Sequence, residues 1–149
     1  MSRITLSVAF EAQHPDALAV YCSDGRFTEA VEALLHGLGF PRLDTLTIPG
    51  GAALLDHTSA SLSGMDAIRQ GTSFLITGHK IKHAVLIAHQ SCGYYKARLP
   101  YDSEESMLRR QLGDLRSADR WLRNDHPGVM VSKYYAWHVA NGVEFELVE

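Results

Sequence analysis

The sequence has too few cysteines for a disulfide-stabilised protein. It contains only Cys22 and Cys92 in 149 residues, whereas small secreted scaffolds use several cysteine pairs. A single disulfide between them would be unusual in a reducing compartment. Each cysteine is therefore expected to be a buried apolar residue, a reactive thiol or a metal ligand.

Long apolar runs and an excess of positive charge are also absent. The stretch HAVLIAH is about the longest apolar run, far short of the roughly 20 residues that span a bilayer. The formal net charge of −3 gives no basic surface of the kind that binds nucleic acid. Thr5 and Ser7 interrupt the apolar N-terminal stretch, which has no small-residue cleavage site typical of a signal peptide. We therefore predict a cytoplasmic protein that binds neither membranes nor nucleic acid.

The sequence shows no internal repeat, low-complexity tract or linker, and its length predicts one domain over residues 1–149. The runs ALAVYC and KHAVLIAH are continuously apolar, as is typical of strands covered on both faces. LDTLTI is a further predicted strand, and Asn141-Gly142 predicts a C-terminal hairpin. Together with the helices between them, these strands indicate an α/β fold. We expect a mostly parallel central sheet flanked by helices, with a C-terminal antiparallel hairpin.

Apolar periodicity predicts the helices. We expect one after Thr28 as its N-cap, one at residues 63–76, a short one at 91–99 and a long one from Asp102 or Ser103. At the N-terminus, apolar residues alternate with polar or small ones, which predicts a half-buried edge strand. Its apolar residues are Ile4, Leu6, Val8 and Phe10.

Metal-binding and charged residues follow directly after the two apolar strands. Cys22, Asp24 and Arg26 come after the first strand, and His89 and Cys92 come at the end of the second. Ligands of open α/β sheets bind beyond the carboxyl ends of strands, where the strand order reverses. If the two strands are neighbours, their ends lie about 5 Å apart. Two thiolates and one imidazole then converge, a set that suits zinc and leaves a fourth coordination position open.

Each of these segments alone also has a simpler interpretation. Free cysteine is often a buried apolar residue, and His89 could be an ordinary core histidine. A redox pair of Cys22 and Cys92 would need Cα atoms within about 7 Å. We favour a metal site because both cysteines fall at the same predicted place, with a histidine three residues before Cys92. Gly93 would let the chain turn sharply there, or let a bound group approach the backbone.

The motifs CSDGR and HQSCG resemble the two signature motifs of the β-class carbonic anhydrases, Cys-x-Asp-x-Arg and His-x-x-Cys-Gly. The resemblance covers nearly the whole chain, including the terminal hairpin. It implies Cys22, His89 and Cys92 as zinc ligands, and Asp24 and Arg26 as a catalytic dyad. It further implies that Asp24 could be the fourth zinc ligand in a closed state, and that the protein forms a homodimer or a higher homo-oligomer.

The resemblance implies a zinc-dependent lyase that hydrates carbon dioxide to bicarbonate through zinc-bound hydroxide. Zinc lowers the pKa of its bound water to about 7, the value known for carbonic anhydrase. The side chains suit this chemistry, since Asp24 can orient the hydroxide and receive its proton. Arg26 can hold that carboxylate with a planar fork of N–H donors that lysine lacks. A hydrolase of carbonyl sulfide or carbon disulfide would use the same nucleophile on the same kind of carbon.

The chain departs from the pattern of the family at several points. It has no leading helices before the first motif, and Pro49-Gly50-Gly51 stands where relatives have an Arg-Asn pair. These departures favour an alternative, a catalytically degenerate zinc- or anion-binding regulatory protein of the same fold. His57 could shuttle protons or be simply exposed. Candidates for lining a substrate pocket, each of which could equally be core packing, are Phe27, Gly51, Ala52, Leu54, Gly93 and Tyr94.

Overall fold

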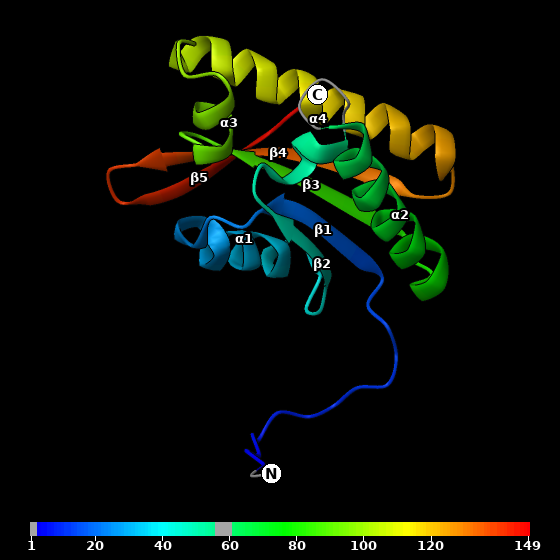
Figure 1. Ribbon diagram of the computed structural model, residues 1–149. Coiled ribbons are helices and arrows are strands. Elements are labelled where there is room, and N and C mark those ends of the chain that lie inside the picture. The colour runs from blue at the N-terminus through cyan, green and yellow to red at the C-terminus, as the bar shows by residue number, and fades with distance from the viewer. Residues whose placement is uncertain (1–2, 56–60) are drawn as a thin grey trace.

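The computed structural model describes residues 3–55 and 61–149. Its five strands form one sheet in the order β2-β1-β3-β4-β5 (Figure 1). The first four strands are parallel, and β5 is antiparallel to β4. This confirms the predicted sheet and hairpin. The bounds of the strands are β1 Ala17–Cys22, β2 Asp44–Ile48, β3 His83–His89, β4 Met130–Val139 and β5 Gly142–Leu147.

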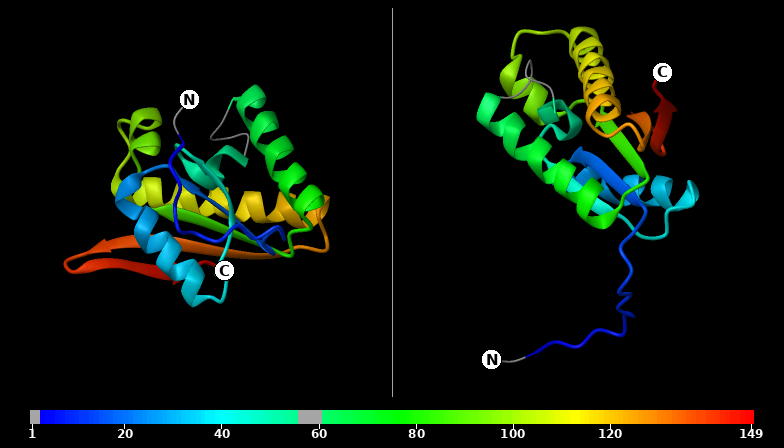
Figure 2. Two further views of the ribbon diagram at one scale, coloured as in Figure 1. Left: turned by 90° about the horizontal axis from the view of Figure 1, so that it is seen from below. Right: turned by 90° about the vertical axis from the view of Figure 1, so that its right-hand side faces the viewer.

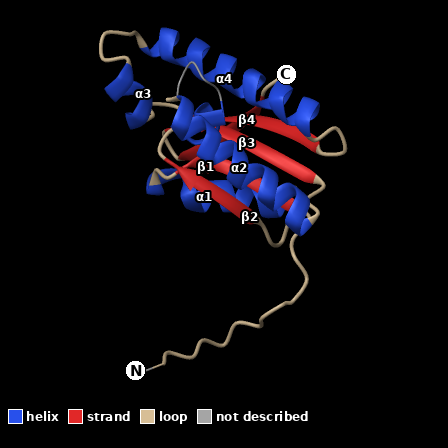
Figure 3. Cartoon of the chain, turned by 45° about the vertical axis from the view of Figure 1, so that its right-hand side comes forward, coloured by secondary structure: helices blue, strands red, loops and turns tan. Residues whose placement is uncertain are grey.

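Helices cover both faces of the sheet, as Figure 2 and Figure 3 show. Helix α1 packs on one face, and α2, α4 and the short 3-10 helix η1 pack on the other. None of the helices in the described residues is long and apolar enough to cross a bilayer. The bounds of the helices are α1 Gly25–Gly37, η1 Gly51–Leu55, α2 Leu62–His79, α3 Gly93–Arg98 and α4 Glu104–Asp125.

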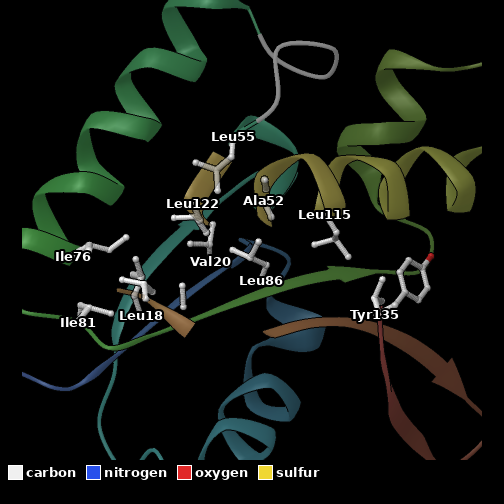
Figure 4. Packing of buried hydrophobic residues seen from close by; sticks show 14 residues of the cluster. Leu18, Val20, Ala52, Leu55, Ile76, Ile81, Leu86, Leu115, Leu122 and Tyr135 are labelled. Atoms are coloured by element: carbon white, nitrogen blue, oxygen red, sulfur yellow. The ribbon is translucent and has the colours of Figure 1, made fainter. Parts of the chain in front are cut away.

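The central strands β1 and β3 are apolar, except for the two terminal histidines of β3, because each of their faces meets a core. Side chains alternate between the two faces of a strand, so Leu18 and Val20 of β1 enter the core under α2 and α4. Ala19 and Tyr21 enter the core under α1. Figure 4 shows the larger core, where Leu86 of β3 packs near Val20. Each fully buried leucine or valine contributes about 1.5–3 kcal/mol relative to an exposed one.

The order of the strands indicates where a ligand site of this sheet is expected. From β1 the chain passes to β2 on one side, and β3 then lies on the other side of β1. The strand order therefore reverses between β1 and β3, and the two strands are neighbours, as the convergence of Cys22 and His89 requires. The carboxyl ends of these two strands are where an open α/β sheet binds its ligands.

Helix α1 begins earlier than predicted. Its N-cap is Asp24, whose side chain accepts a hydrogen bond from the Arg26 backbone N–H at 3.1 Å. Thr28, the expected cap, lies inside the helix. Aspartate ranks above threonine as an N-cap residue, which agrees with Asp24 and not Thr28 taking the position. In α4, Ser103 is the cap, the second of the two predicted starts.

The prediction of an N-terminal edge strand is wrong. Residues 3–16 contain no strand, and the side chains of Ile4, Leu6, Val8 and Phe10 are 74–92% exposed. The segment projects away from the sheet (Figure 2), so its apolar side has no core to face. Alternating apolar residues form a strand only where a sheet edge is there to pair with them.

Candidate metal centre

Three potential metal ligands meet at the switch point of the sheet. Cys22 ends β1, His89 ends β3, and Cys92 stands directly before α3. Their ligand atoms all lie within 4.8 Å of one another, and all three residues are buried. The two Sγ atoms are 3.8 Å apart. The structure thus brings together the three residues that the two sequence motifs supply.

The spacing and the free nitrogen of this cluster fit a zinc ion. Tetrahedral zinc with Zn–S bonds of about 2.3 Å holds two thiolates about 3.8 Å apart, which matches the observed 3.8 Å. His89 Nδ1 donates to the carbonyl oxygen of Gln90 at 2.9 Å, so Nε2 carries the free lone pair. Nε2 is buried and has no hydrogen-bond partner among the described residues. Because a buried polar atom without a partner is costly, a metal bond is the natural partner for this nitrogen.

Hydrogen bonds tune the two sulfur atoms differently. The hydrogen bond with Cys92 lowers the pKa of Cys22 to about 4, against the effect of burial, and the neighbouring His89 side chain and the backbone N–H groups of Gly50 and Asp24 act in the same direction. The Gly50 nitrogen lies 3.4 Å from the Cys22 sulfur. The hydrogen bond with Cys22, together with burial, raises the pKa of Cys92. Without a metal, one thiolate is therefore readily formed, and metal binding must displace the second proton.

Asp24 and Arg26 form a forked ion pair beside Cys22. Arg26 Nε donates to Oδ1 of Asp24 at 2.9 Å, and Nη2 donates to Oδ2 at 2.5 Å. This side-chain hydrogen bonding lowers the pKa of Asp24 to about 2. The carboxylate is thus ionised and fixed in direction. It is not part of the cluster of three ligand atoms among the described residues, and binding of Asp24 to a metal in a closed state stays a prediction.

A cavity of about 400 Å³ lies beside the ion pair and contains one of the predicted pocket residues, Phe27. The centroid of the Phe27 ring lies 4.3 Å from that of His89. Phe27 therefore lines the cavity and also contacts a ligand residue of the candidate metal centre. The residues that line the cavity are Arg26, Phe27, Gln90, Ser91, His138 and Val143.

The other predicted pocket residues lie outside this cavity. Gly51 and Ala52 are buried in η1, and Leu54 of the same helix is half-buried. Tyr94 packs partly buried against the group that contains both cysteines. Gly93 is exposed at the start of α3. Contact of these residues with a substrate stays a prediction, and His57 lies outside the described residues.

The sharp turn between the ligands is made by Ser91 and not by Gly93. Ser91 has a φ of 56°, in the left-handed region that side chains other than glycine rarely adopt. Gly93 shows no positive φ, and it is the first residue of α3. The left-handed residue reverses the chain between His89 and Cys92, so that both side chains face the same point.

Two residues outside the motifs support the ligand-bearing end of β3. Gln111 of α4 donates to the His89 carbonyl oxygen at 2.9 Å, and the Tyr135 hydroxyl donates to Gln111 at 3.1 Å. One signal in the sequence could have indicated Gln111: it is a polar residue on the apolar side of a predicted helix. Gln111 is three residues after Leu108 and four before Leu115, a spacing that places all three on one side of the helix.

Comparison with known proteins identifies the fold. No family model matches the chain, and no curated protein matches it at a significant level. Among solved structures, a β-carbonic anhydrase described as tetrameric, from Sordaria macrospora, has a TM-score of 0.59 and 16% identity. That match covers 90% of this chain and 81% of the other.

Two further solved structures agree. The β-carbonic anhydrase CafA of Aspergillus fumigatus has a TM-score of 0.53 and 20% identity, over 90% of this chain and 76% of the other. A Trichomonas vaginalis β-carbonic anhydrase has a TM-score of 0.57 and 12% identity, over 97% and 88%. Likeness at such low identity shows the fold. The chain is therefore a divergent protein with the fold of the β-carbonic anhydrases.

Proposed function

We propose that the protein is a zinc-dependent lyase that hydrates carbon dioxide to bicarbonate, with residues 1–149 as one domain. The observation that carries the proposal is the convergence of Cys22, His89 and Cys92 within 4.8 Å, next to a carboxylate held by arginine. A purely structural zinc site would have no use for an oriented, ionised Asp24 beside an open coordination position. The β-carbonic anhydrase fold supports the same proposal.

Each residue of the site has a role in this reaction. Cys22 and Cys92 hold the zinc ion through sulfur, and His89 holds it through Nε2. Bound zinc supplies the nucleophile by lowering the pKa of a water molecule toward neutrality. The lone pairs of Asp24 that Arg26 leaves free would accept a hydrogen bond from the attacking water and orient it. Arg26 keeps the Asp24 carboxylate ionised and prevents it from rotating.

The apolar ring of Phe27 beside the site suits carbon dioxide, because carbon dioxide is small, linear and uncharged. Carbonyl sulfide and carbon disulfide share that shape, so they are the alternative substrates to compare. The Pro49-Gly50-Gly51 turn is the feature that favours the other candidate, a degenerate zinc- or anion-binding regulatory protein. Activity measurements separate these three possibilities.

We also propose that the protein is a homo-oligomer. Ile4, Leu6, Val8 and Phe10 expose 74–92% of their surface, and a second copy of the chain would cover them. The Sordaria macrospora enzyme is described as tetrameric, which agrees with self-association. The cytoplasmic location stays a prediction.

The test combines zinc analysis with stopped-flow hydration of carbon dioxide by the wild type and Asp24→Asn. Asparagine caps a helix as well as aspartate does, so the variant is expected to keep its fold and its zinc. Loss of the ionised, orienting carboxylate should lower the hydration rate by about 100-fold or more. The matched control is Asp66→Asn, which alters an exposed carboxylate in α2 and should leave the rate unchanged.

Stoichiometric zinc with hydration no faster than in protein-free buffer, at about pH 7 to 9, would contradict the proposal. Hydrolysis of carbonyl sulfide or carbon disulfide under those conditions would instead identify the hydrolase. Inactivity toward all three molecules would favour the regulatory protein.

A further inference from the structure

A buried amide lies directly behind the candidate metal centre. Gln111 of α4 is only 3% exposed, although its helix neighbours Leu108 and Leu112 pack on the apolar core. Burying an amide among apolar side chains is unfavourable unless both of its ends are hydrogen-bonded. Both ends are bonded here, to the carbonyl oxygen of His89 and to the hydroxyl of Tyr135.

These two bonds fix the orientation of the amide. A carbonyl oxygen can only accept, so Nε2 of Gln111 must face His89, at 2.9 Å. The amide oxygen then faces the Tyr135 hydroxyl, which donates to it at 3.1 Å. A hydrogen-bonded chain therefore runs from β4 through α4 to the last residue of β3.

The bond from Gln111 reaches β3 where the sheet supports this strand on one side only. The pairing between β1 and β3 ends at Val20 and Leu86. Beyond Leu86, β3 runs on to His89 paired only with β4. Gln111 thus fixes the main chain of His89 in the part of β3 that extends past β1.

The ring of His89 is fixed in the same way. Its Nδ1 donates to the Gln90 carbonyl at 2.9 Å, and the Phe27 ring lies against it. With both the ring and the main chain fixed, Nε2 is aimed at the two sulfurs before any metal arrives. A ligand set fixed in advance loses less conformational freedom on binding.

We propose that Gln111 is a positioning residue of the metal centre, which increases zinc affinity by holding the main chain of His89. Tyr135 assists by holding the Gln111 amide. The inference rests on the proposed zinc site, but not on the proposed reaction. Partners of this kind outside the ligand set typically change metal affinity by about 10- to 100-fold.

The test uses two variants and a control on the same helix. Gln111→Met keeps the length of the side chain but removes both hydrogen bonds, and Tyr135→Phe removes only the outer one. The control is Asp119→Asn, eight residues further along α4. Asp119 is also buried, and its bonds go to Lys133 and Arg123 instead of to a ligand-bearing residue.

Zinc dissociation constants are measured by competition with a chelator, and the visible spectrum of the cobalt(II)-substituted protein reports ligand geometry. We expect Gln111→Met to weaken zinc binding by about 10- to 100-fold and to alter the cobalt spectrum. Tyr135→Phe should show a smaller loss. Asp119→Asn should lower the melting temperature but leave zinc affinity and the cobalt spectrum unchanged.

The inference fails if Gln111→Met and Tyr135→Phe both bind zinc as the wild type does. It also fails if Asp119→Asn weakens binding as much as they do, because the effect would then be general destabilisation. Should Gln111→Met not fold, Tyr135→Phe decides alone. A wild type that binds zinc but hydrates no carbon dioxide overturns the proposed function and leaves this inference standing, whereas one that binds no zinc overturns both.

Discussion

Gly51 packs directly on the main chain of Cys22. A Cβ atom on Gly51 would stand 2.7 Å from the Cys22 nitrogen, and the φ of Gly51 is 55°. Both the contact and the backbone conformation therefore require glycine. The start of η1 thus lies against the strand end that carries one of the candidate ligands.

Gly51→Ala should disturb both the fold and the metal centre. The added methyl group must displace the Cys22 main chain, so we expect a loss of about 1–3 kcal/mol in the free energy of unfolding. Zinc affinity should fall as well. Urea unfolding and chelator competition measure the two effects. The control is Gly113→Ala inside α4, where a Cβ atom meets nothing within 4 Å, and about 0.5–1 kcal/mol of stabilisation is expected. A Gly51→Ala protein with wild-type stability and zinc affinity would contradict this close packing.

Cys92→Ser should lose zinc and the stability that zinc confers. Binding of a metal to the folded state alone adds about 2.7 kcal/mol when free metal is 100 times its dissociation constant. A chelator should therefore lower the melting temperature of the wild type but not of Cys92→Ser. Ser23→Ala, which alters an exposed neighbour of Cys22, should respond to the chelator as the wild type does. Full zinc occupancy in Cys92→Ser would show that the ligand assignment is wrong.

Ser91→Val should destabilise the turn between the ligands. Ser91 has a φ of 56°, and a β-branched side chain is especially unfavourable there. We expect a loss of about 1–2 kcal/mol relative to the wild type in chelator-treated protein. Ser132→Val, in strand β4, is the comparison, because valine suits a strand. Equal effects of the two substitutions on thermal unfolding would argue against a strained turn.

The double variant Leu6→Ser, Phe10→Ser should weaken self-association. These side chains are 74% and 92% exposed, so they stabilise their own chain little. Light scattering should show a smaller mean mass at equal concentration, with an unchanged melting temperature at high dilution. Ser7→Ala, between them, serves as the control. A wild type that is monomeric at all concentrations would rule out the proposed homo-oligomer.

The central part of the fold could be predicted because its signals are local. The run that forms β1 is apolar at every position, β3 is apolar between its two terminal histidines, and Asn141-Gly142 marks the hairpin. Cys22 and His89 could be placed at the same end of the sheet because each ends a buried strand, and their convergence depended on the condition that these two strands are neighbours. The N-terminal alternation failed as a prediction because a strand also needs a partner, and residues 3–16 pair with neither of the outer strands, β2 and β5.

The support for the metal centre was harder to predict because it depends on tertiary contacts. Nothing in the motifs indicates how α4 is rotated, so the contact between Gln111 and His89 could not be foreseen. Ser91 was missed because the sequence gives no sign of a left-handed residue other than glycine. The start of α1 was misplaced because two good caps, Asp24 and Thr28, stand four residues apart.

The fixed register of β1 against β3, with Val20 opposite Leu86, restricts where the chain can change in length. Successive residues of a strand face opposite sides of the sheet. Inserting or deleting one residue within either strand would turn Cys22 or His89 to the wrong side and separate the donor atoms. Insertions and deletions that preserve the metal centre are thus confined to parts of the chain outside β1 and β3, such as the loops at the amino ends of the strands.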